Sequence, residues 1–362
     1  MLRIGQFRVI YGHRMKLLIP LMLLTAAGSV GWCNQPVVIA HRGASGYLPE
    51  HTLAAKAMAH AMGADFIEQD LVLSKDAVPM VLHDIYLDTV TDVARRHPSR
   101  KRGDGRYYVL DFTVAELKQL RVTERIDVQT GRPVFPGRFP AGQSSFQLST
   151  FEEELQLIQG LNRSSGRAVG VYPEIKQPKW HRSQGHDISP IVLSVLAQYG
   201  YVNKLDACWL QCFDEVEVRR LRHELDWKGH LLLLIGDKQA NDLSGTVDDP
   251  WPLAGLQELA KTVDGLGPPI SRIVSWTTSG RRSVTNLVKH AHAAKLIVHA
   301  YTVRLDELPP HCPSSDELHA ALFGDAGLDG VFTDFPDATV RWREKHAARK
   351  VKTPNAERML ER

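Results

Sequence analysis

The sequence predicts a single (β/α)8 barrel that begins near residue 37, and three observations support this fold. Apolar, strand-like runs alternate with amphipathic helical stretches along most of the chain. Eight such runs occur within about 300 residues, which is the number that a closed barrel requires. No glycine-rich dinucleotide fingerprint follows the first run, which counts against an open, doubly wound sheet. With 362 residues, 43% of them hydrophobic, the chain is able to build one large core.

The predicted strands are short apolar runs between breaks that contain polar residues or glycine. They span 37–40, 66–71, 169–174, 207–211, 231–235, 264–267, 296–301 and 330–333. The predicted helices show apolar residues at helical spacing, and Thr150 and Asp187 stand where a residue can cap the helix that follows. These helices span 53–62, 151–159, 188–199, 215–225, 255–263, 283–294 and 317–324.

The second strand is predicted to continue into a hairpin. Four polar or small residues, 74–77, separate it from a second apolar run. An antiparallel register that pairs Leu73 with Val78 places Glu68 opposite His83. The hairpin is therefore expected to bring His83 beside the carboxylates of the second strand.

The stretch 85–148 is too long for a barrel connection and fits neither the helical nor the strand period. It is rich in Arg, Gly, Asp and Tyr, so we interpret it as a subdomain inserted over the barrel mouth, with one helix at 113–120. The barrel itself is expected to span 37–345. A second insertion is expected at 237–251, and the charged segment 347–362 is expected to be a poorly packed tail.

The first 33 residues are predicted to be a targeting segment. The apolar stretch after Lys16 is too short, and too interrupted by glycine and serine, for a convincing membrane span. Small residues at Ala27 and Ser29 offer cleavage sites, whether translation starts at Met1 or at Met15. We expect export by a signal peptide and a periplasmic mature protein without stable membrane insertion. The formal net charge of +3 gives no basis for nucleic-acid binding.

Polar fragments follow three of the apolar runs. His41 ends the first, Glu68 and Asp70 belong to the second, and Glu174 closes the third. In a barrel the carboxyl ends of the strands meet at one mouth, so these side chains are expected to converge. Three carboxylates form an oxygen-rich site that favours Ca²⁺, with Mg²⁺ as the alternative, over zinc.

The convergent histidines suit general acid–base chemistry on a phosphoester. Imidazole titrates near neutral pH, so one of His41 and His83 can take a proton while the other supplies one. Arg42 and Lys176 are candidate donors to phosphoryl oxygens. Glu50 is a candidate metal or substrate ligand, although it stands equally well as a favourable charge at a helix N-terminus. The remaining candidate histidines are expected to have structural roles; they are His51, His60, His186 and His299.

Eight segments together resemble the glycerophosphodiester phosphodiesterase family, most closely its bacterial periplasmic branch. They occur in the order HRGASGYLPEHT, GADFIEQDLVLSKD, VLHDIYLDTVTDVA, TFEEELQLIQGLN, VYPEIK, LQCFD, VHAYTVR and GVFTDFPD, and the match runs from about Val37 to Arg343. The resemblance implies a TIM barrel with an inserted subdomain and hydrolysis of glycerophosphodiesters to glycerol 3-phosphate and an alcohol. This reaction would serve the catabolism of glycerol and phospholipid head groups.

The resemblance also implies roles for single residues. His41 and His83 match the catalytic histidines, and Arg42 and Lys176 match the phosphate contacts. The calcium ligands match Glu68, Asp70 and Glu174. The family often has Asn where this chain has His51.

Two other functions remain open at this stage. One is a phospholipase D-like or sphingomyelinase-like enzyme, which would act on membrane lipids. The other is a surface lipoprotein or adhesin on the same fold, which would require acylation at Cys33, where the preceding Trp32 is a poor context. The head-group preference, the oligomeric state, the nucleophile (water or a glycerol hydroxyl) and the assignment of acid and base are also open.

Overall fold

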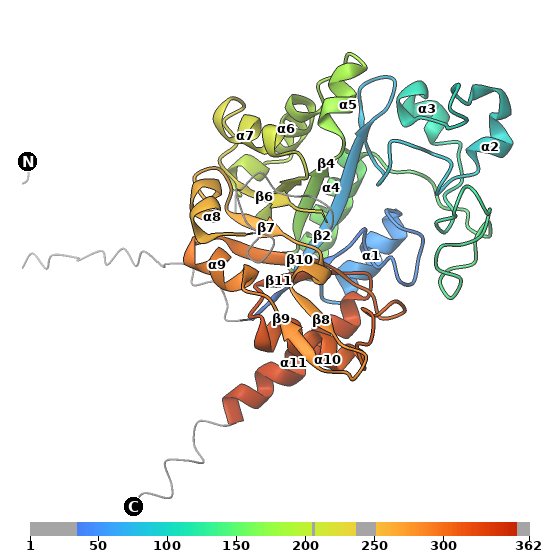
Figure 1. Ribbon diagram of the computed structural model, residues 1–362. Helices are drawn as coiled ribbons and strands as arrows, with labels where there is room; N and C mark the ends of the chain where they lie inside the picture. Colours follow the sequence, from blue (N-terminus) through green and yellow to red (C-terminus); the bar gives the residue numbers. More distant parts are fainter. Residues whose placement is uncertain (1–34, 205–206, 237–250, 353–362) are drawn as a thin grey trace, which may run out of the picture. The chain divides into compact units, whose positions relative to one another are not determined.

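The computed structural model describes residues 35–204, 207–236 and 251–352. Eight parallel strands form a closed barrel, in the order β1-β11-β10-β7-β6-β5-β4-β2, and the pairing of β2 with β1 closes the ring (Figure 1). The strands are β1 (Val37–Ala40), β2 (Phe66–Leu73), β4 (Gly170–Ile175), β5 (Trp209–Cys212), β6 (His230–Leu234), β7 (Gly265–Gly267), β10 (Ile297–Val303) and β11 (Gly330–Thr333). The predicted fold class is confirmed.

Helices surround the barrel, because each strand's outward side chains need a second apolar layer. The main ones are α1 (Leu53–Ala61), α4 (Phe151–Ser165), α5 (Pro178–Ser183), α6 (Ile188–Gln198), α7 (Glu215–His223), α8 (Leu253–Leu259), α9 (Leu287–Ala293), α10 (Ser315–His319) and α11 (Pro336–Lys352). Thr150 caps α4 in a capping box with Glu153, as its position predicts. Asp187 stands at the start of α6 without a capping hydrogen bond and instead pairs with Arg220.

Large side chains fill the barrel interior. Ile39, Tyr172, Trp209 and Phe332 are buried there, and the rings of Tyr172 and Trp209 stack with centroids 5.9 Å apart. The Tyr172 hydroxyl lies 2.8 Å from Nδ1 of His299, so this predicted structural histidine has a buried partner. The packed interior leaves the carboxyl ends of the strands as the place for chemistry.

The predicted hairpin forms, but its register is shifted by one residue. β3 (Pro79–Val81) pairs with β2 so that Leu73 lies opposite Pro79 rather than Val78. The amide of Ser74 donates to the carbonyl of Val78, which leaves a three-residue turn with Ala77 in the left-handed region (φ 59°). The prediction assumed a four-residue turn, and the shorter turn moves Glu68 out of direct opposition to His83.

The connection between β3 and α4 is the insertion after the second strand. It contains α2 (Val93–Arg96), η1 (Pro98–Arg100), η2 (Val109–Asp111) and α3 (Val114–Leu117). An apolar cluster of its own, including Leu87, Val93, Phe112 and Leu120, packs against Met80 of the hairpin. α3 is shorter than the predicted helix 113–120, and Thr113 caps it in a second capping box.

Two further differences concern the second half of the barrel. A small antiparallel pair, β8 (Val274–Trp276) and β9 (Arg282–Val284), occupies the start of the helix predicted at 283–294, so α9 begins at Leu287. Helix α11 continues to Lys352 and therefore includes residues 347–352 of the predicted tail. The predicted signal peptide and most of the second insertion lie outside the described residues. No helix in the described ranges is long and apolar enough to cross a membrane.

Candidate active site

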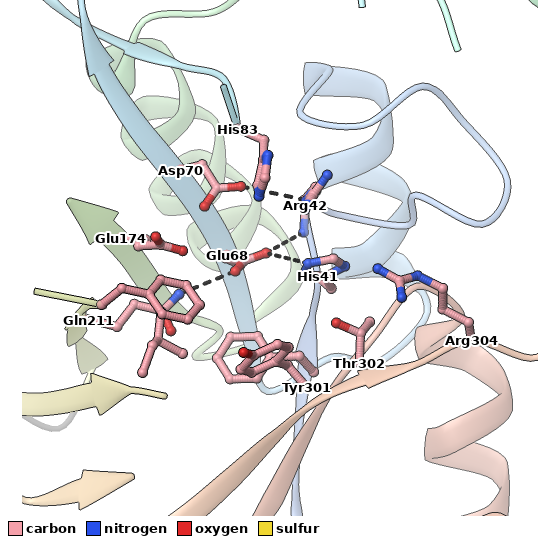
Figure 2. Close-up of a pocket in the computed structure, with 13 residues that line it drawn as sticks. His41, Arg42, Glu68, Asp70, His83, Glu174, Gln211, Tyr301, Thr302 and Arg304 are labelled. Atoms are coloured by element: carbon pink, nitrogen blue, oxygen red, sulfur yellow. Dashed lines mark hydrogen bonds and ion pairs between the residues drawn. The ribbon is translucent and has the colours of Figure 1, made fainter. Parts of the chain in front are cut away.

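The mouth of the barrel holds one polar cavity into which neighbouring strands project their last side chains. β1 leads directly to His41 and Arg42, β2 contributes Glu68 and Asp70, and the hairpin leads to His83 (Figure 2). The lining residues are His41, Arg42, Glu68, Asp70, His83, Glu174, Gln211, Phe213, Leu234, Tyr301, Thr302, Arg304 and Phe332. The structure thus brings together six of the eight predicted site residues in one cavity.

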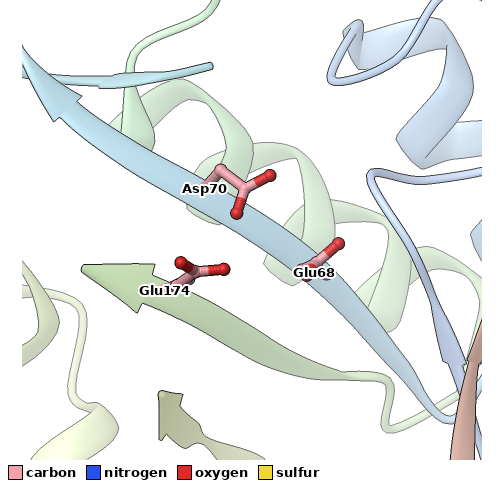
Figure 3. Close-up of side chains that lie close together, drawn as sticks. All are labelled: Glu68, Asp70 and Glu174. Carbon is pink, nitrogen blue, oxygen red and sulfur yellow. The ribbon is translucent and has the colours of Figure 1, made fainter. Parts of the chain in front are cut away.

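Glu68, Asp70 and Glu174 form a buried carboxylate cluster (Figure 3). Each offers one oxygen, and these oxygens lie within 4.8 Å of one another. Burial and the neighbouring Asp70 raise the pKa of Glu68 well above its usual value. Burial also raises the pKa of Glu174, to about 8, and the Asp70 charge contributes despite the opposing effect of Lys176. Oδ1 of Asp70 is buried without a hydrogen-bond partner. The three carboxylates repel one another, and one of them has an oxygen that accepts no hydrogen bond. A divalent cation bound between them would offset this repulsion.

Each predicted catalytic histidine is held by a carboxylate. Nδ1 of His41 lies 2.5 Å from Oδ1 of Asp334, and Nδ1 of His83 lies 2.6 Å from Oδ1 of Asp84. Nε2 of His41 lies 3.9 Å from Oε2 of Glu68, on the cavity side. Figure 2 shows His83 beside Asp70 rather than beside Glu68, and the amide of Leu82, the residue before His83, donates to the carbonyl of Asp70 at 2.9 Å.

The charge states of these pairs determine the tautomers. Burial and the Arg42 guanidinium lower the pKa of both His41 and His83 to about 4. Burial disfavours ionisation of Asp334 and Asp84, yet their histidine and arginine partners hold the pKa of each carboxyl well below its usual range. An ionised carboxylate only accepts, so each imidazole donates through Nδ1–H and keeps Nε2 for proton exchange.

The three predicted substrate-binding residues differ in their position relative to the cavity. Arg42 has a left-handed backbone (φ 59°), and its amide donates to Oε2 of Glu68 at 2.8 Å. Lys176 lies 2.8 Å from Oε1 of Glu174 and lines an adjoining groove that His83 also borders. Glu50 does not line the cavity. Its Oε2 accepts from Arg42 at 2.9 Å, and both of its oxygens accept from Arg125. Glu50 therefore orients Arg42 from outside the cavity.

His51 contacts the carboxylate cluster, unlike the other histidines that were expected to be structural. Its Nε2 lies 2.8 Å from Oδ2 of Asp70. Its Nδ1 lies 3.1 Å from Nζ of the fully buried Lys56, which also pairs with Glu154 at 3.2 Å. An ammonium group only donates, so Nδ1 of His51 accepts and Nε2–H donates to Asp70. This leaves Oδ1 of Asp70 without a hydrogen bond, with Nζ of Lys176 at 3.7 Å. His60, His186 and His299 do not line the cavity.

Sequence reasoning missed several residues that contact the site. Asp334 lies in the GVFTDFPD segment, where an aspartate directly after a strand was the available signal. Gln211 stands near the end of β5, and its amide donates to Oε1 of Glu68 at 3.2 Å. Lys56 and Arg125 carried no local signal, because one lies within a helix and the other within an irregular insertion.

Comparisons with known proteins identify the family of the chain. The model of the glycerophosphoryl diester phosphodiesterase family matches residues 41–338. The chain is 41% identical to the glycerophosphodiester phosphodiesterase of Haemophilus influenzae, over 91% of this chain and 99% of that protein. It is 38% identical to the enzyme of the same name from Treponema pallidum, over 89% and 96% of the two chains.

Solved structures share the fold. An Oleispira antarctica phosphodiesterase in complex with its product sn-glycerol-3-phosphate superposes with a TM-score of 0.56 at 22% identity, over 86% of this chain and 97% of that chain. The glycerophosphodiester phosphodiesterase of Thermotoga maritima gives a TM-score of 0.53 at 18% identity, over 85% and 98%. From the family model and the two bacterial relatives, the chain belongs to the glycerophosphoryl diester phosphodiesterase family.

Proposed function

We propose that this protein hydrolyses glycerophosphodiesters to glycerol 3-phosphate and an alcohol. The relatives that match nearly its whole length have this activity in their names. The observation that supports it best is the cavity itself, where two carboxylate-held histidines and Arg42 border the same space as the carboxylate cluster. A phosphodiester needs a base, an acid and positive charge around the phosphoryl group, and this cavity offers all three.

We assign the metal site to Glu68, Asp70 and Glu174, and we propose Ca²⁺ as its occupant. Ca²⁺ accepts several carboxylates in flexible geometry, whereas Mg²⁺ keeps more of its water and is bound by one or two carboxylates. A bound divalent cation supplies positive charge that stabilises the negative charge developing on the phosphoryl oxygens. His51 and Lys176 hold the carboxylates in place from two sides, through Asp70 and Glu174 respectively.

His41 and His83 would perform the proton transfers. Nε2 of one histidine accepts the proton of the attacking hydroxyl as the new P–O bond forms. The other histidine enters the step as the imidazolium, with a second proton on Nε2 and its positive charge stabilised by the carboxylate at Nδ1. It gives the Nε2 proton to the alkoxide that leaves as the P–O bond to the head group breaks. The attacking hydroxyl belongs either to water or to the glycerol moiety of the substrate, and the second route passes through a cyclic phosphate that is then hydrolysed. Arg42 and Lys176 donate to the phosphoryl oxygens on either route.

The decisive assay measures glycerol 3-phosphate released from a panel of glycerophosphodiesters, with Ca²⁺, with Mg²⁺ and after EDTA treatment. We expect release with Ca²⁺ and loss of activity after EDTA that Ca²⁺ restores. Full activity of the EDTA-treated enzyme would contradict the metal assignment. Absence of release from every substrate would contradict the proposed reaction and favour the adhesin alternative.

We also propose that the segment 1–33 is a signal peptide that directs the protein to the periplasm. Its composition supports this, since a basic start, an apolar stretch and small residues follow one another. Cell fractionation should find the mature protein in the periplasmic fraction. Recovery in washed membranes, with processing that globomycin blocks, would instead indicate a lipoprotein acylated at Cys33.

A further inference from the structure

The insertion after β3 contributes two arginines at the barrel mouth. Each donates a hydrogen bond to the carboxylate of a different histidine–aspartate pair. We propose that Arg125 and Arg138 are positioning residues, through which the insertion holds both catalytic imidazoles in their working tautomer and orientation. This inference rests on the proposed function of His41 and His83. It assigns the insertion a catalytic contribution beyond covering the cavity.

Arg138 acts on the His41 side. Oδ1 of Asp334 faces His41, and Oδ2 accepts from Nη2 of Arg138 at 2.7 Å and from Nε of Arg304, which lies outside the insertion, at 3.0 Å. The arginine side chain is only 4% exposed. Its Nε donates to Oδ2 of Asp306 at 2.8 Å, and the same Nη2 donates to Oδ1 of Asp306 at 3.0 Å. The guanidinium lies 3.7 Å from the ring centre of Phe135. Asp306 and Phe135 thereby hold the guanidinium in the position from which it donates to Asp334.

Arg125 has the same relation to His83. Oδ1 of Asp84 faces His83, and Oδ2 accepts from Nη1 of Arg125 at 2.7 Å. The remaining edge of Arg125 donates to Glu50, with distances of 2.9 and 2.6 Å. Glu50 in turn accepts from Arg42, which borders the cavity. Arg125 thus links the insertion to His83 and to the phosphate-binding arginine.

The two sides share one arrangement, although their sequences are unrelated. In each pair one carboxylate oxygen accepts from the imidazole, while the other accepts from an arginine of the insertion. A guanidinium stays charged and only donates, so the carboxylate it holds remains an ionised acceptor. The imidazole must then donate through Nδ1 and present Nε2 to the cavity. Neither arginine lines the cavity, so their effect on the histidines passes through Asp84 and Asp334, while Arg125 also reaches Arg42 through Glu50.

The insertion also contains a matched control. Arg106 donates to both oxygens of Asp88, at 2.6 and 2.9 Å, and its guanidinium lies 3.9 Å from the ring centre of Tyr86. This pair resembles that of Arg138 with Asp306 and Phe135 in chemistry. Its hydrogen bonds go to Asp88, and its charge acts on Asp84 only as a minor coulombic contribution. Removing Arg106 therefore tests the insertion's own stability without removing a hydrogen bond of either histidine–aspartate pair.

The experiment compares Arg138→Gln, Arg125→Gln and Arg106→Gln in the full-length, Ca²⁺-loaded enzyme. We expect kcat to fall about 10- to 100-fold in the first two, as for other partners that orient reacting groups, with a much smaller change in KM. Arg106→Gln should lower Tm by an amount similar to that in the other two variants and leave kcat at the wild-type value. Arg138→Lys and Arg125→Lys should recover part of kcat, because they restore the charge but not the planar fork.

Proton NMR provides a readout that is independent of turnover. The Nδ1–H protons of His41 and His83 donate to ionised carboxylates over short distances and should give far-downfield signals, assigned by His41→Gln and His83→Gln. Arg138→Gln should shift or broaden the His41 signal and Arg125→Gln the His83 signal, while Arg106→Gln changes neither. If both signals and kcat survive in the two arginine variants, the inference is wrong. If wild-type enzyme releases no glycerol 3-phosphate, the proposed function fails while the NMR result still decides the positioning role.

Discussion

The two ends of the barrel use carboxylates in opposite ways. At the amino end, an aspartate stands directly before each of three strands: Asp65 before β2, Asp264 before β7 and Asp329 before β11. Each accepts from the amide of the second residue of the neighbouring strand, at distances of 2.7, 2.9 and 2.7 Å. Each also has a basic partner, respectively Arg343, Arg222 and His292. Each of these carboxylates therefore links its own strand to the neighbouring strand by a hydrogen bond.

At the carboxyl end, the carboxylates face one another. Glu68 and Glu174 have raised pKa values because of burial and mutual repulsion, and one oxygen of Asp70 has no hydrogen-bond partner. Such an arrangement costs stability unless a cation occupies it. The comparison separates the stabilising end of the barrel from the functional end, as expected for this fold. Substitutions at the two ends should therefore affect different measurements.

The largest effect on rate should follow from removing either histidine at the functional end. His41→Ala and His83→Ala should each lower kcat about 10²- to 10⁴-fold, because each loses a proton-transfer group, and Tm should change little. A nitrophenyl ester needs little protonation of its leaving group. It should therefore restore turnover in the variant that lacks the acid and not in the variant that lacks the base. Near-wild-type turnover of glycerophosphocholine by either variant would remove that histidine from the mechanism.

The next effect concerns metal affinity. Glu174→Gln removes one charge from the carboxylate cluster, so Ca²⁺ should bind more weakly, measured by calorimetry, and excess Ca²⁺ should restore part of the activity. The metal-free variant loses the repulsion from Asp70 and also the ion pair with Lys176 at 2.8 Å. Because the pKa of Glu174 is raised to about 8, burial and repulsion outweigh that ion pair, so the metal-free variant should be at least as stable as the metal-free wild type. A lower Tm of the metal-free variant would mean that Glu174 stabilises the fold, which would weaken the contrast between the two ends.

A substitution at the amino end should give the reverse pattern. Asp264→Ala leaves the amide of Leu231 and the guanidinium of Arg222 without this acceptor. The carboxylate is partly exposed, so we expect a loss of about 1–2 kcal/mol in the free energy of unfolding rather than the full value for a buried charged hydrogen bond. Denaturant unfolding measures this loss, and kcat and Ca²⁺ affinity should stay at wild-type values. A fall in kcat in the folded variant would show that the two ends are coupled.

The sequence predicted the functional end better than the stabilising end, for physical reasons. Polar residues that end apolar runs stand out locally, which is why His41, Glu68, Asp70 and Glu174 were found together. An aspartate before a strand looks like any loop residue, and its partner strand is not visible in the local pattern. The same limit hid Arg138, which is 196 residues from Asp334. The hairpin register also depends on the left-handed backbone of Ala77. A glycine at this position would have indicated such a conformation, whereas an alanine does not.

The smallest effect should be a pH dependence at the amino end. Asp329 accepts from His292 at 2.9 Å, and this bond raises the pKa of His292 above its usual value of 6.5. A raised histidine pKa means that the pair contributes its full stability below about pH 6.5 and loses it as the pH rises through the folded-state pKa. Both side chains are partly exposed, so the contribution is about 0.2–1 kcal/mol. His292→Gln should therefore unfold more easily than wild type at acidic pH, and the two unfolding curves should converge at alkaline pH. A difference that persists at alkaline pH would assign the effect to packing rather than to the ion pair.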